Sequence, residues 1–268
     1  MGGRAELLRR RGDRMGMVLD GGCRVTHAAE GEATHSGTMT TRRHVGRATG
    51  ASAISLRTME FAQGRSPDWV NPACDDVLYV VAGRGTIHLD GRPFEIAPDT
   101  GVYVAPGTQA SIENPGPGPI LIVSSQCPEP PQPDRIATPH TGPVAGTAAP
   151  TPSPIVRLSE TQAQITGDRW YRVMVDERAG SRHVTQFVGS IPPGRSPDHY
   201  HHYEEVLYIL RGTGVMWAGS DRSPIGPASC IFLPATQLHC VENTGRQELV
   251  LLGVFYPAGS PAVRYGPK

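Results

Sequence analysis

The chain has no excess charge of either sign, because 25 Lys and Arg residues balance 25 Asp and Glu residues among 268. It has no Lys/Arg-rich face interleaved with aromatic residues, so we expect no nucleic-acid partner. No apolar run approaches the length of a membrane span, and the N-terminus lacks the apolar core of a signal peptide. These absences predict a cytoplasmic protein that binds neither nucleic acid nor membrane.

Cysteine and aromatic residues are also scarce. The five cysteines are scattered and form no Cys-x-x-Cys pair, which is typical of reduced thiols rather than of a disulfide framework. Aromatic residues make up 6% of the chain, whereas it contains 32 glycines and 26 prolines. This composition favours many short strands joined by turns, so we predict an all-β fold. The length allows two domains, each with its own core.

The most informative segment is rich in histidine. His199 and His201 are two residues apart, so on a strand their imidazoles point to the same face. Glu205 follows closely, and His239 lies in a second strand-like segment. Three neutral imidazoles and one carboxylate can hold a first-row transition metal and leave coordination positions open. The pattern therefore predicts a metal site in the second half of the chain.

The second half resembles the cupin family at these residues. The first cupin motif, G-x5-H-x-H-x3,4-E-x6-G, is matched with one residue fewer between its first Gly and first His. The second motif, G-x5-P-x-G-x2-H-x3-N, is matched except that Ala228 and Thr236 replace its glycines. The resemblance implies a small jelly-roll β-barrel whose metal ligands are His199, His201, Glu205 and His239.

The first half repeats the second. Residues 64–68 and 194–198 share the sequence Gly-Arg-Ser-Pro-Asp, and residues 75–85 align with residues 204–214. Self-similarity at an offset of roughly 130 residues indicates two copies of one structural unit. The chain thus resembles a bicupin, with two cupin-type jelly-roll barrels, over nearly its whole length.

The first copy lacks the metal-binding residues. Trp69 and Asn71 stand where the second copy has its paired histidines, and Asp76 replaces the glutamate. Ala110 or Ser111 falls at the position of the third histidine. We therefore predict a metal-free first barrel and one metal per chain.

The sequence predicts four segments. An N-terminal arm spans residues 1–45, a metal-free barrel 46–127, a linker 128–154 and a metal-binding barrel 155–268. The linker contains nine prolines, which favours an extended conformation. Within the first barrel, the sequence Leu-Asp-Gly-Arg at 89–92 predicts a hairpin turn.

A metal held in this way could polarise a carbonyl or carboxylate, activate water or bind O₂. Imidazole-rich ligation suits Fe, Ni, Cu or Zn, and the carboxylate admits Mn. The resemblance also suggests weaker catalytic candidates around the barrel mouth. These are Arg182, Gln186, Tyr203, Tyr208 and Trp217.

Three functions agree with these observations. The resemblance favours a non-heme iron dioxygenase acting on a small polar metabolite, with Fe as the metal. The first alternative is a non-redox isomerase, lyase, decarboxylase or aminohydrolase that uses Mn, Zn or Ni. The second alternative is a small-molecule-binding cupin without turnover. A homodimer is a further state that the sequence leaves open.

Overall fold

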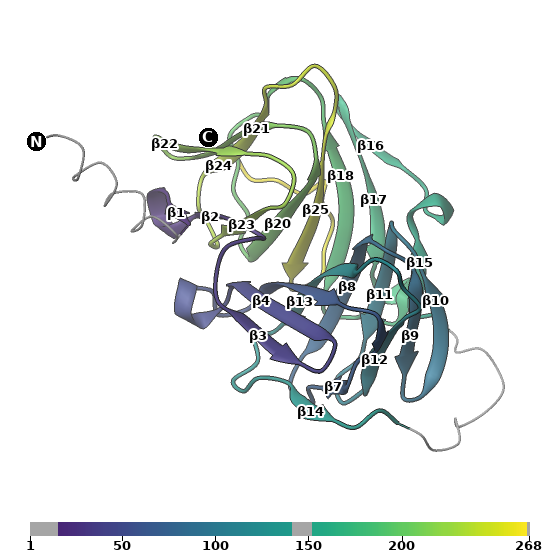
Figure 1. The fold of residues 1–268 in the computed structure, drawn as a ribbon. Coiled ribbons are helices and arrows are strands. Elements are labelled where there is room, and N and C mark those ends of the chain that lie inside the picture. The colour runs from purple at the N-terminus through teal and green to yellow at the C-terminus, as the bar shows by residue number, and fades with distance from the viewer. Residues whose placement is uncertain (1–15, 141–151, 267–268) are drawn as a thin grey trace, which may run out of the picture.

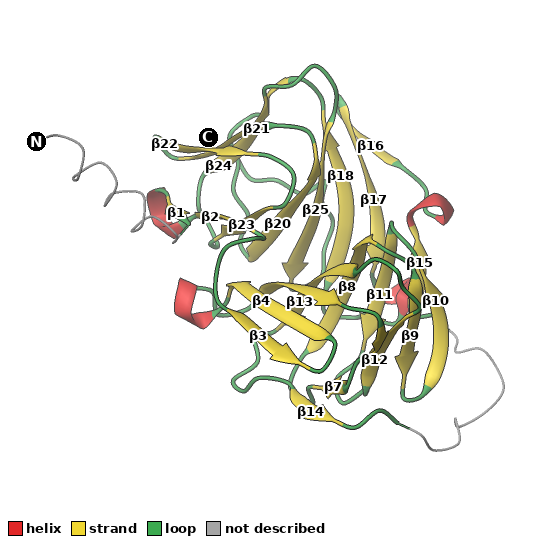
Figure 2. Ribbon diagram, in the orientation of Figure 1, coloured by secondary structure: helices red, strands yellow, loops and turns green. Residues whose placement is uncertain are grey.

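The computed structural model describes residues 16–140 and 152–266. The described chain is built almost entirely from antiparallel strands, arranged as two barrels that each consist of a larger and a smaller sheet (Figure 1). Within residues 16–140 and 152–266, the only helical elements are four short 3₁₀ turns (Figure 2), at Asp20–Gly22, Arg47–Thr49, Leu158–Glu160 and Glu177–Ala179. This agrees with the all-β bicupin prediction.

The larger sheet of the first barrel has the strand order β15-β11-β8-β13-β5-β4-β3. Its strands, in chain order, are β3 (Ala33–Ser36), β4 (Met39–Val45), β5 (Leu56–Phe61), β8 (Asp75–Ala82), β11 (Thr100–Val104), β13 (Ile120–Cys127) and β15 (Ile155–Arg157).

The smaller sheet of the first barrel has the order β10-β9-β12-β7-β14, with β6 also paired to β12. The predicted turn joins Leu89 to Arg92, and its central residues Asp90 and Gly91 have positive φ. The strands are β6 (Gly64–Arg65), β7 (Asp68–Val70), β9 (Gly85–Leu89), β10 (Arg92–Ile96), β12 (Ala110–Asn114) and β14 (Arg135–Ala137).

The second barrel has a larger sheet in the order β1-β2-β23-β20-β25-β18-β17-β16 and a smaller one in the order β19-β24-β21-β22. The larger sheet contains β1 (Met17–Val18), β2 (Arg24–His27), β16 (Gln164–Thr166), β17 (Arg169–Val175), β18 (Thr185–Ile191), β20 (Glu204–Arg211), β23 (Ser229–Leu233) and β25 (Leu249–Tyr256). The smaller contains β19 (Gly194–Arg195), β21 (Gly214–Ala218), β22 (Asp221–Ile225) and β24 (His239–Asn243).

The core has three parts. Each barrel encloses its own cluster of aliphatic and aromatic side chains between its two sheets, and a third cluster joins the barrels. This follows from strand alternation, since successive side chains of the larger sheets point alternately into their own barrel and toward the other barrel. In β20, for example, Leu207 and Ile209 face the barrel interior, whereas Val206 and Tyr208 face the first barrel.

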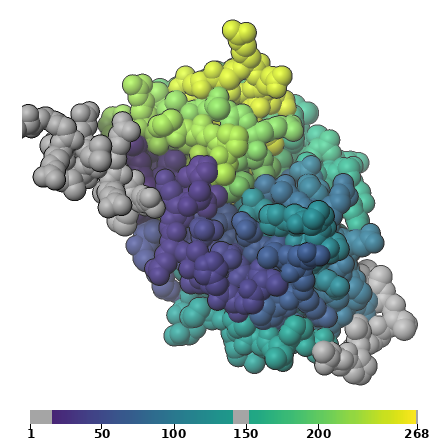
Figure 3. Space-filling view, viewed as in Figure 1, coloured from purple at the N-terminus to yellow at the C-terminus, as the bar shows by residue number. Residues whose placement is uncertain are grey.

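Each barrel also takes a strand from the other half of the chain. β2, from the N-terminal segment, pairs with β23 of the second barrel, while β15 pairs with β11 of the first. Figure 3 shows the N-terminal segment, in purple, lying against both barrels. Glu204 adds a polar contact between the barrels by accepting backbone hydrogen bonds from Ser52 and Ala53. The domain boundaries drawn from the sequence stay a proposal, and this exchange crosses them.

Within the described residues, no helix is long and apolar enough to span a membrane. All five cysteines are buried and unpaired with one another.

Candidate metal centre

Three segments of the second barrel carry the predicted ligands. Glu205 is the second residue of β20 and His239 the first residue of β24. His199 lies in the loop before β20, where two backbone hydrogen bonds of 3.0 and 2.9 Å pair it with His239. His201 lies in the same loop, and its carbonyl accepts a hydrogen bond from the Thr236 amide. Backbone pairing thus fixes the loop that carries His199 and His201 against β24 and the residues just before it.

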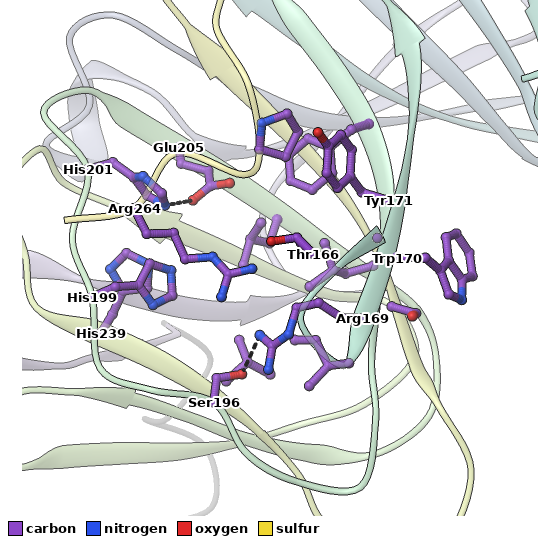
Figure 4. A pocket seen from close by; sticks show the side chains of 18 residues that line it. Thr166, Arg169, Trp170, Tyr171, Ser196, His199, His201, Glu205, His239 and Arg264 are labelled. Carbon is purple, nitrogen blue, oxygen red and sulfur yellow. Dashed lines mark hydrogen bonds and ion pairs between the residues drawn. The ribbon is translucent and has the colours of Figure 1, made fainter. Parts of the chain in front are cut away.

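The three imidazoles converge on one point. One ring nitrogen from each of His199, His201 and His239 lies within 4.8 Å of the other two. The Oε2 atom of Glu205 is 3.6 Å from Nε2 of His201 (Figure 4). The structure therefore clusters the three predicted histidines and places Glu205 beside His201.

Hydrogen bonds set the tautomers of two of these histidines. Nδ1 of His199 lies 3.0 Å from the Pro197 carbonyl, and Nδ1 of His239 lies 2.8 Å from the Gln237 carbonyl. A carbonyl oxygen only accepts, so each Nδ1 carries the hydrogen and each Nε2 keeps a free lone pair. Such outer hydrogen bonds are the usual means of orienting a metal-binding imidazole.

Burial disfavours the charged forms of the proposed ligand side chains. Desolvation, reinforced by His199, lowers the pKa of His201 to about 4. Desolvation, again reinforced by His199, lowers the pKa of His239 to about 3. It also raises the pKa of Glu205 to about 8, with Arg264 opposing the rise. Two of the imidazoles are thus poised as neutral donors at pH 7, whereas Glu205 must lose a proton to become a ligand.

The donor set fits a divalent transition metal. Neutral imidazoles with one carboxylate match the ligand preferences of Mn, Fe, Ni and Zn. The first barrel has no such set: Arg57 donates to Asp76, the counterpart of Glu205, at 2.6 Å. A guanidinium therefore occupies the place beside this carboxylate that a metal would need.

The histidines and Glu205 line a cavity of about 90 Å³. At roughly 10–15 Å³ per water in such a measure, the cavity has room for about six to nine water-sized groups. Its walls are mainly apolar, with polar groups supplied by Thr166, Ser190 and Ser196 and by two arginines, Arg169 and Arg264. Ser190 is buried, and its hydroxyl has no hydrogen-bond partner in the described structure. The cavity suits a small ligand that brings its own polar atoms.

The weaker candidates from the sequence lie outside this cavity's lining. Arg182 is exposed in the loop before β18, and Trp217 donates to Glu242 between Arg195 and Arg222.

Gln186 and Tyr208 also fail to reach the cavity. Tyr208 belongs to the cluster between the barrels, and Gln186 faces Gly101 of the first barrel. Strand alternation explains both positions, because their neighbours Phe187 and Leu207 are the residues that point into the cavity. Tyr203 stacks on His201 with ring centroids 5.0 Å apart, so it supports a ligand from behind.

Sequence reasoning missed Arg169, Arg264 and Ser190. Arg169 begins β17, directly after the Gly167-Asp168 turn. Arg264 lies beyond the last strand, in a segment without strand periodicity. The available signal was the repeat itself, since the first copy also continues beyond its last strand across the barrel mouth.

Comparison with known proteins agrees with this architecture. Residues 187–255 match the cupin domain family. The Bacillus subtilis oxalate decarboxylase superposes with a TM-score of 0.71 at 14% identity, covering 88% of this chain and 78% of that one. The chain has the bicupin fold. The fold places the matched cupin segment in the second barrel, around β18 to β25.

Other known proteins are similar to the chain over different lengths. A structure described as a glyoxylate-induced protein from Pseudomonas aeruginosa gives a TM-score of 0.70 at 17% identity, covering 90% of this chain and 91% of that chain. The oxalate-binding protein of Thermotoga maritima is 38% identical over 66 residues, which are 24% of this chain and 54% of its own.

Auxin-binding protein 1 of Arabidopsis thaliana is 30% identical over 83 residues, covering 27% of this chain and 42% of its own. The matches therefore span about half the length of these curated relatives. At these identities the solved structures establish the fold and leave the activity open.

Proposed function

We propose that this bicupin is a metal-dependent enzyme that acts on a small polar metabolite at one site in its second barrel. The observation that carries the proposal is the convergence of His199, His201, Glu205 and His239 on one small cavity. In this assignment the four side chains hold one divalent metal. A metal bound there would act as a Lewis acid toward a carbonyl or carboxylate oxygen.

The residues of the chain have separable roles in this proposal. The Nδ1 hydrogen bonds of His199 and His239 orient their rings before any metal arrives. The apolar walls around Phe187 and Leu251 exclude bulk water, which strengthens electrostatic interactions inside the cavity. The free hydroxyl of Ser190 is available to a bound substrate.

We favour a non-redox reaction of the lyase or decarboxylase class with Mn as the metal. Support comes from the shared fold with the Bacillus subtilis oxalate decarboxylase, which carries Mn(II) centres, and from the oxygen ligand supplied by Glu205. The comparisons give no support to the expectation of Fe. An iron dioxygenase stays the alternative, and a metal-loaded binding protein without turnover is the third outcome. The homodimer and the cytoplasmic location stay predictions from the sequence.

The test combines metal analysis with a substrate screen. Untagged protein is analysed for metal and then incubated with small carboxylic acids and amides while CO₂ release and O₂ uptake are recorded. Substrate turnover without O₂ consumption supports the non-redox proposal, whereas stoichiometric O₂ uptake supports the dioxygenase. Tight binding without turnover supports a metal-loaded binding protein. His239→Ala should abolish the signal, and His88→Ala, in the surface pair with Glu113 of the first barrel, is the matched control.

A further inference from the structure

Both barrels are crossed by the segment that follows their last strand. β13 ends at Cys127 and β25 at Tyr256, and a proline follows each. The first strap, residues 128–140, pairs β14 with β7, which carries Trp69. The second strap, residues 257–266, pairs Tyr265 with Tyr200, beside His199. The strap is therefore part of the repeated unit and covers the same mouth in each copy.

The two straps bring opposite charges to the mouth. The first strap contributes Asp134, which forms an ion pair with the buried Arg57. With that ion pair in place, the remaining cavity is only about 10 Å³, too small for a ligand. The second strap contributes Arg264, which reaches into the open cavity of the second barrel (Figure 4).

Arg57 pairs with two carboxylates, whereas Arg264 has no such partner among the described residues. Among the described residues, no group forms a hydrogen bond or ion pair with its guanidinium, although the residue is half-buried. Arg169 lines the same cavity with a side chain only 12% exposed, donates to Ser196 and pairs with Asp168. Two guanidiniums therefore face one small cavity. Burial lowers the pKa of Arg264, and repulsion from Arg169 lowers it further, while Asp168 and Glu205 oppose the shift.

An anion between these side chains would relieve the repulsion. Among the described residues, Glu205 is the only acidic one that lines this cavity, and the proposed metal would share its charge. A guanidinium binds a carboxylate with paired, charge-assisted hydrogen bonds. The small cavity volume limits the anion to a few non-hydrogen atoms.

We infer that Arg264, carried by the second strap, binds the carboxylate of a small substrate together with Arg169, and that the strap closes over the bound anion. This inference rests on the proposed function for the reaction itself, but the anion site is built from side chains that are not metal ligands. It assigns the substrate class as a short mono- or dicarboxylate. It also identifies residues 257–266 as the element that selects it.

The strap is suited to such a movement. Two backbone hydrogen bonds join Tyr265 to Tyr200, and the two rings stack with centroids 5.7 Å apart. The first strap, by contrast, is held by the Asp134 ion pair and by Glu129, which is buried against Arg43. The second strap has no ion pair of its own among the described residues. Substrate carboxylate would supply the missing interaction.

The test measures binding of oxalate and acetate by calorimetry to the metal-loaded protein, with oxamide and acetamide as uncharged probes. Arg264→Met should weaken the carboxylates roughly ten- to a hundredfold and leave the amides nearly unchanged. Arg264→Lys should recover part of the loss, and Arg246→Met, on an exposed turn, is the matched control. Equal carboxylate affinity in Arg264→Met and wild type would overturn the inference.

Two further readouts separate this inference from the proposed function. Metal content should be the same in Arg264→Met and wild type, because Arg264 is not a proposed ligand. A wild-type protein without metal would refute the proposed function. Normal metal content in Arg264→Met with unchanged carboxylate binding would refute only the role of the strap.

Oxalate should also slow hydrogen exchange at the Tyr265 amide in wild type and not in Arg264→Met. An exchange rate of the Tyr265 amide that oxalate leaves unchanged in wild type would refute closure of the strap.

Discussion

Arg57 and Asp76 form a buried ion pair in the first barrel, with Nη2 of Arg57 2.6 Å from Oδ2 of Asp76. In the repeat, Arg57 lies seven residues before Gly64, and Phe187 lies seven residues before Gly194. One copy thus sets a cation beside its carboxylate, while the other sets an apolar ring near Glu205 and leaves that carboxylate for a metal. The difference between Arg57 and Phe187 explains how the same fold has a cavity filled by an ion pair in the first barrel and an open cavity in the second.

Metal stoichiometry follows from this difference. We expect about one equivalent of metal per chain, because only the second barrel gathers imidazoles in the described structure. His239→Ala should remove most of it, since even the loss of an outer-shell partner commonly costs roughly ten- to a hundredfold in affinity. Elemental analysis of untagged protein provides the measurement. Two equivalents in the wild type would contradict the assignment.

Asp76→Asn should affect stability and not metal content. The substitution leaves the buried Arg57 with Asp134 as its remaining charged partner, and we expect a loss of about 3 kcal/mol in the free energy of unfolding. Urea denaturation measures the loss, and Glu160→Gln is the control because its pair with Arg157 is exposed and worth under about 1 kcal/mol. A loss of metal in Asp76→Asn would show that the first barrel takes part in the site.

Glu205 should make the metal-free protein less stable as the pH rises from 6 to 8. Burial raises the pKa of Glu205 from 4.5 to about 8 on folding, so the folded state holds an extra proton between these values. The stabilisation from this proton is complete below pH 4.5 and is lost as the pH rises through 8. Between pH 6 and pH 8, the loss should be about 2 kcal/mol larger in wild type than in Glu205→Gln. Parallel profiles for the two proteins would refute this.

Metal bound to the second barrel should also protect the first. The barrels share a hydrophobic cluster, exchange β2 and β15, and are joined by Glu204. We therefore expect chelation to accelerate hydrogen exchange within residues 56–127 as well as within 185–256. Acceleration confined to the second range would mean that the barrels respond independently.

The sequence predicted the features that depend on local spacing. The His-x-His pair, Glu205 and the Asp90-Gly91 turn are read directly from residue order, and the repeat revealed the two barrels. Arg264 escaped prediction because its position depends on a strap that crosses the mouth from the far end of a long strand. The side-chain directions of Gln186 and Tyr208 escaped because alternation gives two opposite faces without telling which one lines the cavity.

The exchange of strands between the barrels was equally hidden. β2 could pair with the edge of either larger sheet on local grounds, and its choice of β23 depends on the folded arrangement of both barrels. Because the two halves have similar sequences, their larger sheets offer similar edge strands. Only tertiary packing distinguishes them.

The reciprocal pairing of β2 with β23 and of β15 with β11 has a consequence for how the chain can be divided. A fragment ending at residue 140 would retain β2 without its sheet, and a fragment beginning at residue 152 would retain β15 without its sheet. Each half would thus expose an unpaired edge that only the other half is shaped to cover. Separately produced halves should therefore reassemble by complementation, with recovery of metal binding as the signal that they have found each other.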